Sequence, residues 1–349
     1  MQIQVQTFTV HKRFALTISR GTSSKSTNVW LRLEHDGIEG WGEASPFSVG
    51  SPPQTTEAIA TSLMQLAPPL KSLTPYDQQP LNDLLNHRSI PSAARAALDV
   101  AIHDWIGKRL NVPLWKLWGC DRDRIGPTSV TVGISSPDAA QVRMRHWLQS
   151  TEVQAVKVKL GNPAGIEADQ SMLKAVQAIA PTHAKFSIDA NGGWSLGDAL
   201  TMSFWLADQG ITYIEQPLPP GQDDDLPQLY RESPLPIFVD ESCFTSRDIP
   251  RLAGRVHGIN IKLMKSGGLS EARRMIHTAQ AHDLQLMFGC YSDSGLANTA
   301  AAQLASFATH LDLDSHLNLA DDPFIGATLQ GGRLQPNDLP GLGVQRAEG

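Results

Sequence analysis

The sequence predicts a mixed α/β protein in which an N-terminal α+β capping domain precedes a parallel (β/α)7–8 barrel. Three observations support this fold class. Strand-like and helix-like segments alternate from about residue 129 to residue 314. Within this region three acidic residues each end a strand-like segment, at steps of 26 and 25 residues. The first 125 residues follow a different pattern that is typical of antiparallel strands.

The predicted capping domain covers residues 1–125. It opens with three strand-like segments separated by turn residues, which predicts an antiparallel meander: MQIQVQTFTV, TNVWLRLEHDG and IEGWGEA. Two helix-like segments follow, over residues 51–67 and 90–110. The second has Pro91 near its start and small residues on one face.

The predicted barrel covers residues 126–316. Its eight strand-like segments are 128–134, 155–160, 184–190, 211–217, 236–241, 258–263, 284–289 and 310–314. Each gap holds a segment with helical spacing of apolar residues. Eight such units in one run favour a closed TIM-like barrel over an open doubly wound sheet. The Gly/Pro-rich segment 317–349 is expected to return to the capping domain.

Composition excludes several classes of function. The net charge of −6 is spread without a basic stripe, so no nucleic-acid partner is expected. No stretch approaches the roughly 18 apolar residues of a membrane span, and the N-terminus lacks a signal peptide. The three widely separated cysteines indicate reduced thiols. We therefore expect a cytoplasmic protein without a membrane partner.

The three strand-terminal acids are Asp189, Glu215 and Asp240. Because adjacent parallel strands end at the same side of a barrel, we expect their carboxylates to lie together. A set of oxygen ligands selects Mg²⁺, with Mn²⁺ as a substitute, rather than zinc. The alternative for each acid is a helix cap or a loop salt bridge. We expect one metal ion per subunit.

Lysines flank this acidic trio. Lys157 and Lys159 are two residues apart on one strand and share a face. Inside a barrel, their repulsion and a nearby dication would lower a lysine pKa and create a base; on an exposed strand edge they would be solvated. Lys262 lies on the sixth strand, opposite the second, where it could serve as a base on the other side of a substrate. Lys265 is expected to be a loop or helix-start residue.

Three further residues are candidates for substrate binding. Asp312 and Asp314 share a face of the eighth strand and could hold an ammonium group; the alternative is a pair of surface or capping acids. Arg20 lies in a flexible Ser/Thr/Gly stretch that could close over a pocket and bind a carboxylate. The histidines show no metal-binding spacing and are expected to be structural.

The segments KVKLG, SIDANGGW, YIEQPL, VDES and NIKLMKSGGL, in this order and spacing, resemble the enolase superfamily in its muconate lactonising subgroup. GWGEASP and ISRGTS resemble that group's capping domain, so the resemblance covers nearly the whole chain. It implies that Asp189, Glu215 and Asp240 bind the metal. It also implies that Lys159 and Lys262 are the two bases, with Lys157 tuning Lys159.

The LDLD segment resembles the dipeptide epimerases of this subgroup, where the two acids hold the substrate's α-amino group. This implies a Mg²⁺-dependent dipeptide epimerase that inverts the C-terminal α-carbon through an enediolate by two-base 1,1-proton transfer. L-Ala-D/L-Glu is the default substrate, because Arg20 could pair with the glutamate; hydrophobic and cationic dipeptides stay open as alternatives. Specificity is expected in the segments 17–27 and 45–55. Tyr291 and Asp293 stand where the resemblance predicts Met and Glu, which affects the pocket shape.

Two alternatives stay open at this point. An o-succinylbenzoate synthase or cycloisomerase would share the first half-reaction, but its substrate has no ammonium group for Asp312 and Asp314. A barrel that binds metal and ligand without catalysis would have no use for the lysine bases. Barrels of this kind often assemble, so a homo-oligomer is also expected.

Overall fold

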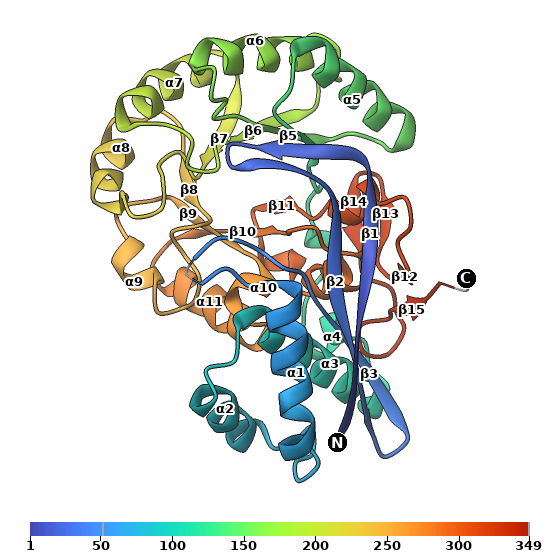
Figure 1. Ribbon diagram of the computed structural model, residues 1–349. Coiled ribbons are helices and arrows are strands. Elements are labelled where there is room, and N and C mark those ends of the chain that lie inside the picture. Colours follow the sequence, from blue (N-terminus) through green and yellow to red (C-terminus); the bar gives the residue numbers. More distant parts are fainter. Residues whose placement is uncertain (51, 348–349) are drawn as a thin grey trace.

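The computed structural model describes residues 1–50 and 52–347. Figure 1 shows a ring of strands surrounded by helices, with a long two-stranded hairpin reaching across it from a smaller N-terminal part. The N-terminal part is a three-stranded antiparallel sheet with helices packed on it, and the ring is an eight-stranded parallel sheet. The fold class predicted from the sequence is confirmed.

The hairpin consists of β1 (Gln2–Ile18) and β2 (Gly21–His35), and β3 (Ile38–Ala44) completes the sheet. The pairing of β1 with β2 continues out to Ile18 and Gly21. The prediction of a flexible loop around Arg20 is therefore wrong, because only residues 19 and 20 separate the strands. Serine and threonine suit an exposed strand as well as a loop, and two cross-strand hydroxyl pairs, Thr9–Thr27 and Thr17–Thr22, are each 2.9 Å apart.

Three helices cover this sheet: α1 (Thr56–Leu70), α2 (Gln78–His87) and α3 (Ser92–Leu110). Helix α3 packs very closely on β3. A Cβ atom at Gly40 or Gly42 would lie 2.0 or 1.9 Å from the carbonyl oxygens of Ala101 and Ala97. The small face predicted for this helix thus meets a glycine-containing strand, which allows the two backbones to touch. Helix α4 (Leu114–Leu117) and a 3-10 turn, η1 (Arg122–Arg124), lead into the barrel.

All eight predicted barrel strands are present. They are β4 (Val130–Val132), β5 (Ala155–Lys159), β6 (Lys185–Asp189), β7 (Ile211–Glu215), β8 (Ile237–Val239), β9 (Gly258–Ile261), β10 (Gln285–Gly289) and β11 (His310–Asp312). They pair in sequence order, all parallel. A parallel bridge between Thr128 and Leu311 joins the first strand to the last and closes the barrel.

The helices that surround the barrel are α5 (Pro137–Ser150), α6 (Ile166–Gln177), α7 (Leu196–Asp208), α8 (Leu226–Glu232), α9 (Ile249–Leu252), α10 (Leu263–Ser266), α11 (Leu269–Ala281) and α12 (Gly295–Ala302), with 3-10 turns η2 (Asp223–Asp225), η3 (Ala305–Phe307) and η4 (Ser315–Asn318). A separate apolar cluster of Tyr213, Phe238 and Met287 adjoins the buried charges, since Met287 Sδ lies 3.9 Å from Lys157 Nζ.

The segment after the barrel contains two short strand pairs, β12 (Phe324–Ile325) with β15 (Gln345–Arg346) and β13 (Thr328–Gln330) with β14 (Arg333–Gln335). It contacts the capping domain: Leu342 N donates to Asp104 in α3 at 2.8 Å, and Asp321 pairs with His11 in β1. Residues 348–349 of the predicted C-terminal segment lie outside the described residues. Among the described residues, no helix is long and apolar enough to cross a membrane.

Candidate active site

The three predicted metal ligands lie side by side at the carboxyl ends of adjacent strands. Asp189 ends β6, Glu215 ends β7, and Asp240 follows β8 directly. Asp189 is in register with Glu215 on one side and with Lys159 on the other. All three carboxylates are at most 1% exposed. The strand period of two therefore places these acids together inside the mouth of the barrel, as expected.

Each of these carboxylates is bound by a lysine. Lys159 Nζ lies 2.7 Å from Asp189, and Lys262 Nζ lies 2.7 Å from Asp240. Lys157 Nζ lies 2.5 Å from Glu215. The buried positive and negative charges thus compensate one another, which satisfies the general requirement that buried ions be paired.

The pKa values of these lysines do not follow the prediction. Burial lowers the pKa of Lys159, but Asp189 and Asp312 outweigh that effect and the pKa is raised. Burial likewise opposes the charge of Lys262, yet Asp240 and other groups hold its pKa well above the usual value. Lys157 does lower the pKa of Lys159, as expected, but the carboxylates of Asp189 and Asp312 outweigh this repulsion.

The oxygen atoms at the mouth of the barrel are of the type that binds a hard divalent cation. They comprise carboxylate oxygens together with two buried oxygens that have no hydrogen-bond partner among the described residues, Asn191 Oδ1 and Glu241 Oε2. Oxygen ligands of this type suit Mg²⁺. In residues 1–50 and 52–347, however, no three acidic, histidine or cysteine side chains converge as a ready-made metal site. The carboxylates face the lysines, so they would have to turn to share an ion.

Asp312 and Asp314 lie on the inner side of the seam where the barrel closes. Asp312 accepts hydrogen bonds from Ser129 Oγ at 2.7 Å and Lys157 Nζ at 2.8 Å. Asp314 accepts one from the backbone of Thr131 at 2.6 Å. Each acid is 5% exposed, so the alternative of surface acids is wrong. Burial and the charge of Asp312 raise the pKa of Asp314 to about 6.

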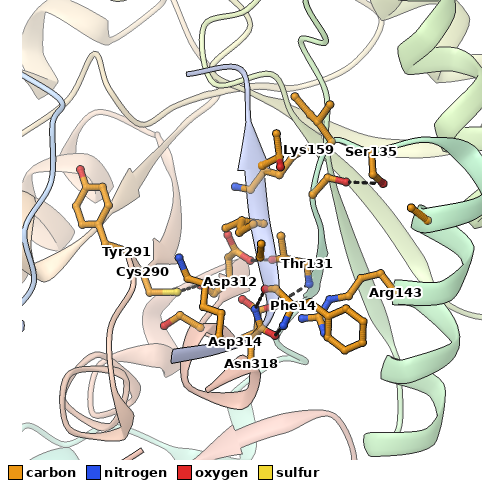
Figure 2. Close-up of a pocket in the computed structure, with 18 residues that line it drawn as sticks. Phe14, Thr131, Ser135, Arg143, Lys159, Cys290, Tyr291, Asp312, Asp314 and Asn318 are labelled. Atoms are coloured by element: carbon orange, nitrogen blue, oxygen red, sulfur yellow. Dashed lines mark hydrogen bonds between the residues drawn. The ribbon is translucent and has the colours of Figure 1, made fainter. Parts of the chain in front are cut away.

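Figure 2 shows the cavity beside these acids, which has a volume of about 210 Å³. A larger cavity of about 630 Å³ lies between the hairpin and the barrel mouth, and both Lys159 and Lys262 line it. The two cavities share Lys159 and Tyr291. Lys157 is fully buried and lines neither of them. It therefore pairs with the buried carboxylates of Glu215 and Asp312 and does not contact a molecule in either cavity.

Arg20 lies at the rim of the larger cavity, but its guanidinium is already engaged. Arg20 Nη2 lies 2.7 Å from Glu241, and Nη1 donates to the carbonyl of Asn191 at 2.7 Å. Ser19 donates to the same carbonyl at 2.9 Å. The turn of the hairpin is thus attached to the loops that follow β6 and β8. A substrate carboxylate would have to compete with Glu241 for Arg20.

Four residues of this site were missed by the sequence interpretation: Asn191, Glu241, Asn260 and Lys265. Lys265 was expected to be a loop or helix-start residue. It lies in α10, is 1% exposed, and binds Asp240 Oδ1 at 2.6 Å. Asn260 donates to Glu215 Oε1 at 2.6 Å. Its position two residues before Lys262 was a usable signal, because Lys262 continues β9 in extended backbone and the two side chains therefore share one face.

Tyr291 and Asp293, where the sequence departs from the resemblance, both contact the capping domain. The Tyr291 ring stacks on Phe47 with centroids 4.8 Å apart, and Ser45 donates to Asp293. The segment 45–55 therefore lies against the loop that follows β10, although residue 51 is outside the described part of the chain. The replacement of the expected Met by Tyr291 therefore changes the wall of the larger cavity, where the capping domain meets the barrel.

The comparisons with known proteins agree with this geometry. Residues 139–348 match the family model described as enolase C-terminal domain-like, and residues 2–119 match the N-terminal domain of the mandelate racemase / muconate lactonizing enzyme family. The two matches correspond to the two parts of the fold: the N-terminal match covers the α+β cap, and the C-terminal match covers most of the barrel with its charged mouth. The chain belongs to the enolase superfamily, in its mandelate racemase / muconate lactonizing enzyme family.

Among similar proteins, a hydrophobic dipeptide epimerase of a Flavobacteria bacterium is 43% identical over 100% of this chain and 99% of its own. Another of the same description, from Roseobacter litoralis, is 42% identical over 98% of both chains. An L-Ala-D/L-Glu epimerase of Bacteroides thetaiotaomicron is 34% identical over 96% of this chain and 85% of its own.

Solved structures give the same result. The dipeptide epimerase from Enterococcus faecalis, complexed with Mg and L-Leu-L-Tyr, matches with a TM-score of 0.91 and 28% identity over 98% of both chains. The dipeptide epimerase from Cytophaga hutchinsonii, complexed with Mg and D-Ala-L-Val, matches with a TM-score of 0.93 and 26% identity over 100% of this chain and 96% of its own.

Proposed function

We propose that this protein is a Mg²⁺-dependent dipeptide epimerase that inverts the α-carbon of the C-terminal residue. One observation carries the proposal: Lys159 and Lys262, from strands on different sides of the barrel, line the same cavity. Two ammonium-bearing side chains around one space can act on two faces of one carbon atom. The names of the similar enzymes support the same reaction class.

Asp189, Glu215 and Asp240 would hold one Mg²⁺ ion, with Mn²⁺ as a substitute. Bound there, the ion would supply positive charge to a substrate carboxylate. The structures of relatives complexed with Mg support this assignment. Asn191 donates to Asp189 at 3.0 Å, Asn260 donates to Glu215, and Lys265 binds Asp240, so these three residues would hold the acids in place.

The two lysines would share the proton transfer. The neutral form of one lysine takes the α-proton from one face of the carbon, and the ammonium form of the other donates a proton to the opposite face. The substrate keeps its number of protons, and the enzyme exchanges the roles of the two lysines. Both side chains must therefore lie within hydrogen-bond reach of the carbon, which their shared cavity supports.

Asp312 and Asp314 would bind the α-ammonium group of the dipeptide. Lys157 neutralises Asp312, so Asp314 is the more available carboxylate. Such an ammonium-binding role would separate the epimerase from an o-succinylbenzoate synthase or cycloisomerase, whose substrates offer no ammonium group. Asp314→Asn should raise KM for dipeptides by about 10- to 100-fold, the range for a hydrogen bond to a charged group. An unchanged KM would favour the synthase.

We propose that the C-terminal residue is apolar. The rim of the larger cavity carries Leu16, Ile18, Phe47 and Val49, and Glu241 already occupies Arg20. The relatives at 43% and 42% identity are named as hydrophobic dipeptide epimerases. L-Ala-L-Glu, the default expected from the sequence, becomes the comparison substrate.

The reaction can be tested by proton NMR in D₂O with Mg²⁺ and a panel led by L-Ala-L-Leu and L-Ala-L-Glu. Loss of the C-terminal α-proton signal together with a new diastereomer is the expected result, faster for the leucine peptide. Exchange without a new diastereomer would mean that one lysine alone acts. No exchange across the panel would contradict the proposal, and the succinylbenzoate precursor would be tested next.

A further inference from the structure

The smaller cavity contains a buried arginine with no role in the proposed chemistry. Arg143 projects from α5 into the cavity that Asp312 and Asp314 also line, as Figure 2 shows. The hairpin also lines this cavity, through Phe14 and its neighbours. The cavity thus adjoins the two acids, whereas Lys262 lines only the larger cavity.

The guanidinium of Arg143 is poorly satisfied. The residue is 9% exposed, and its Nη1 atom is buried without a hydrogen-bond partner among the described residues. Asp314 is the acid that acts on it most, but no ion pair within 4.0 Å joins the two in the described structure. A guanidinium has five N–H donors, and burying one without an acceptor is costly.

Stacking accounts for part of this arrangement only. The guanidinium carbon lies 4.0 Å from the ring centre of Trp147 and 4.6 Å from that of Phe14. These contacts stabilise the faces of the guanidinium plane. They leave its edge, where the N–H groups lie, without acceptors. A purely structural role would therefore explain the position of the side chain but not its unpaired donors.

A second cation faces the same cavity. Lys12 lines it, and its ammonium group donates to Ser23 Oγ at 3.0 Å and the Ser23 carbonyl at 3.4 Å rather than to a carboxylate. The cavity therefore offers two acids for a ligand ammonium and, next to them, two cations that lack carboxylate partners. A ligand that complements it would carry one ammonium group and one nearby carboxylate.

We propose that Arg143 selects dipeptides whose N-terminal residue has an acidic side chain. This inference rests on the proposed function, since Asp312 and Asp314 must hold the α-ammonium group of that residue. Its side chain would then enter the cavity that Arg143 lines. A carboxylate there would accept hydrogen bonds from the free edge of the guanidinium, whereas a basic side chain would be repelled by Arg143 and Lys12.

The test compares three substrates that share a C-terminal leucine: L-Glu-L-Leu, L-Gln-L-Leu and L-Lys-L-Leu. Proton exchange in D₂O gives kcat/KM for each with the wild type, Arg143→Met and Arg143→Lys. Arg145→Met is the matched control, because Arg145 lies on the same helix, is exposed and donates a hydrogen bond to Gln141. The wild type should prefer Glu over Lys by at least about tenfold, as expected for a charge-assisted hydrogen bond.

Arg143→Met should lower the Glu-to-Lys ratio to a residual value set by Lys12, and Arg143→Lys should leave an intermediate ratio. A wild-type preference for Lys, or a ratio unchanged by Arg143→Met in a folded variant, would overturn the proposal. Exchange of L-Ala-L-Leu by the wild type reports separately on the proposed function. If that exchange is absent, calorimetric binding of the same three peptides still decides whether Arg143 selects the acidic one.

Discussion

Lys262 Nζ lies 4.7 Å from the centre of the Tyr291 ring, and the same ring stacks on Phe47 of the capping domain. The capping domain is thus joined through one aromatic ring to a proposed catalytic base. A ring face stabilises an ammonium group by roughly 0.5 to 2 kcal/mol. Tyr291 therefore positions Lys262 and helps to keep it protonated.

Tyr291→Leu should lower kcat by up to about tenfold and shift the basic limb of the pH–rate profile to lower pH, because the pKa of Lys262 falls when the ring is lost. Tyr291→Phe keeps the ring and removes a hydroxyl that is buried without a partner in the described structure. The Phe variant should therefore lose much less activity than the Leu variant. Equal losses would show that the hydroxyl, not the ring, matters.

Lys159→Met and Lys262→Met should each abolish epimerisation, because inversion needs a proton donor on the face opposite the base. Each variant should still exchange the α-proton of one diastereomer with D₂O, and the two variants should act on opposite diastereomers. NMR of both diastereomers measures this. Wild-type turnover by either variant would refute the two-base assignment. Lys174→Met, on the exposed face of α6, is the control.

Arg20→Ala should reduce kcat/KM to a similar degree for L-Ala-L-Leu and L-Ala-L-Glu. The reason is that Arg20 binds Glu241 and the carbonyl of Asn191, so its loss weakens the attachment of the hairpin turn for every substrate and leaves only the hydrogen bond from Ser19. The ratio of the two kcat/KM values is the measurement. A KM increase confined to the glutamate peptide would instead restore the role in side-chain recognition that the sequence suggested.

Glu43 of β3 should make stability depend on pH. Burial and the nearby Asp293 raise the pKa of Glu43 from 4.5 to about 8. The folded state then holds a proton that the unfolded state has released, so stability falls as pH rises from about 4.5 to about 8. Urea denaturation at several pH values should show that the free energy of unfolding falls by an amount on the order of a few kcal/mol over this range. The Glu43→Gln variant should not show this fall. The exposed Glu34→Gln variant should keep the wild-type slope.

The barrel and its charged mouth could be predicted because strand periodicity determines where the side chains point. Asp189, Glu215, Lys159 and Lys262 lie at or directly after strand ends, so their positions follow from sequence spacing. Glu241 and Lys265 lie beyond the strands, where no period indicates direction. Their roles depend on contacts that only the folded chain creates, such as that of Glu241 with Arg20.

The lysine pKa values show a second limit. The sequence places Lys157 next to Lys159 and so predicts repulsion between them. In the fold the lysine pKa values are raised instead of lowered, because carboxylates lie next to the ammonium groups. Lys157, for example, lies within 2.8 Å of both Glu215 and Asp312, which come from other strands. The hairpin around Arg20 was missed for a related reason: a run of serine and threonine fits a strand or a loop equally well until its partner strand is known.

The seam at Thr128 and Leu311 also sets an order of assembly. Ser129 and Thr131 bind Asp312 and Asp314 across 183 residues of chain. At 5 to 20 residues per second, a ribosome needs about 10 to 40 seconds to synthesise that stretch. The three proposed metal ligands are therefore synthesised well before Asp312 and Asp314, the proposed site for a peptide's amino group. The proposed substrate site is complete only when the last barrel strand closes the ring.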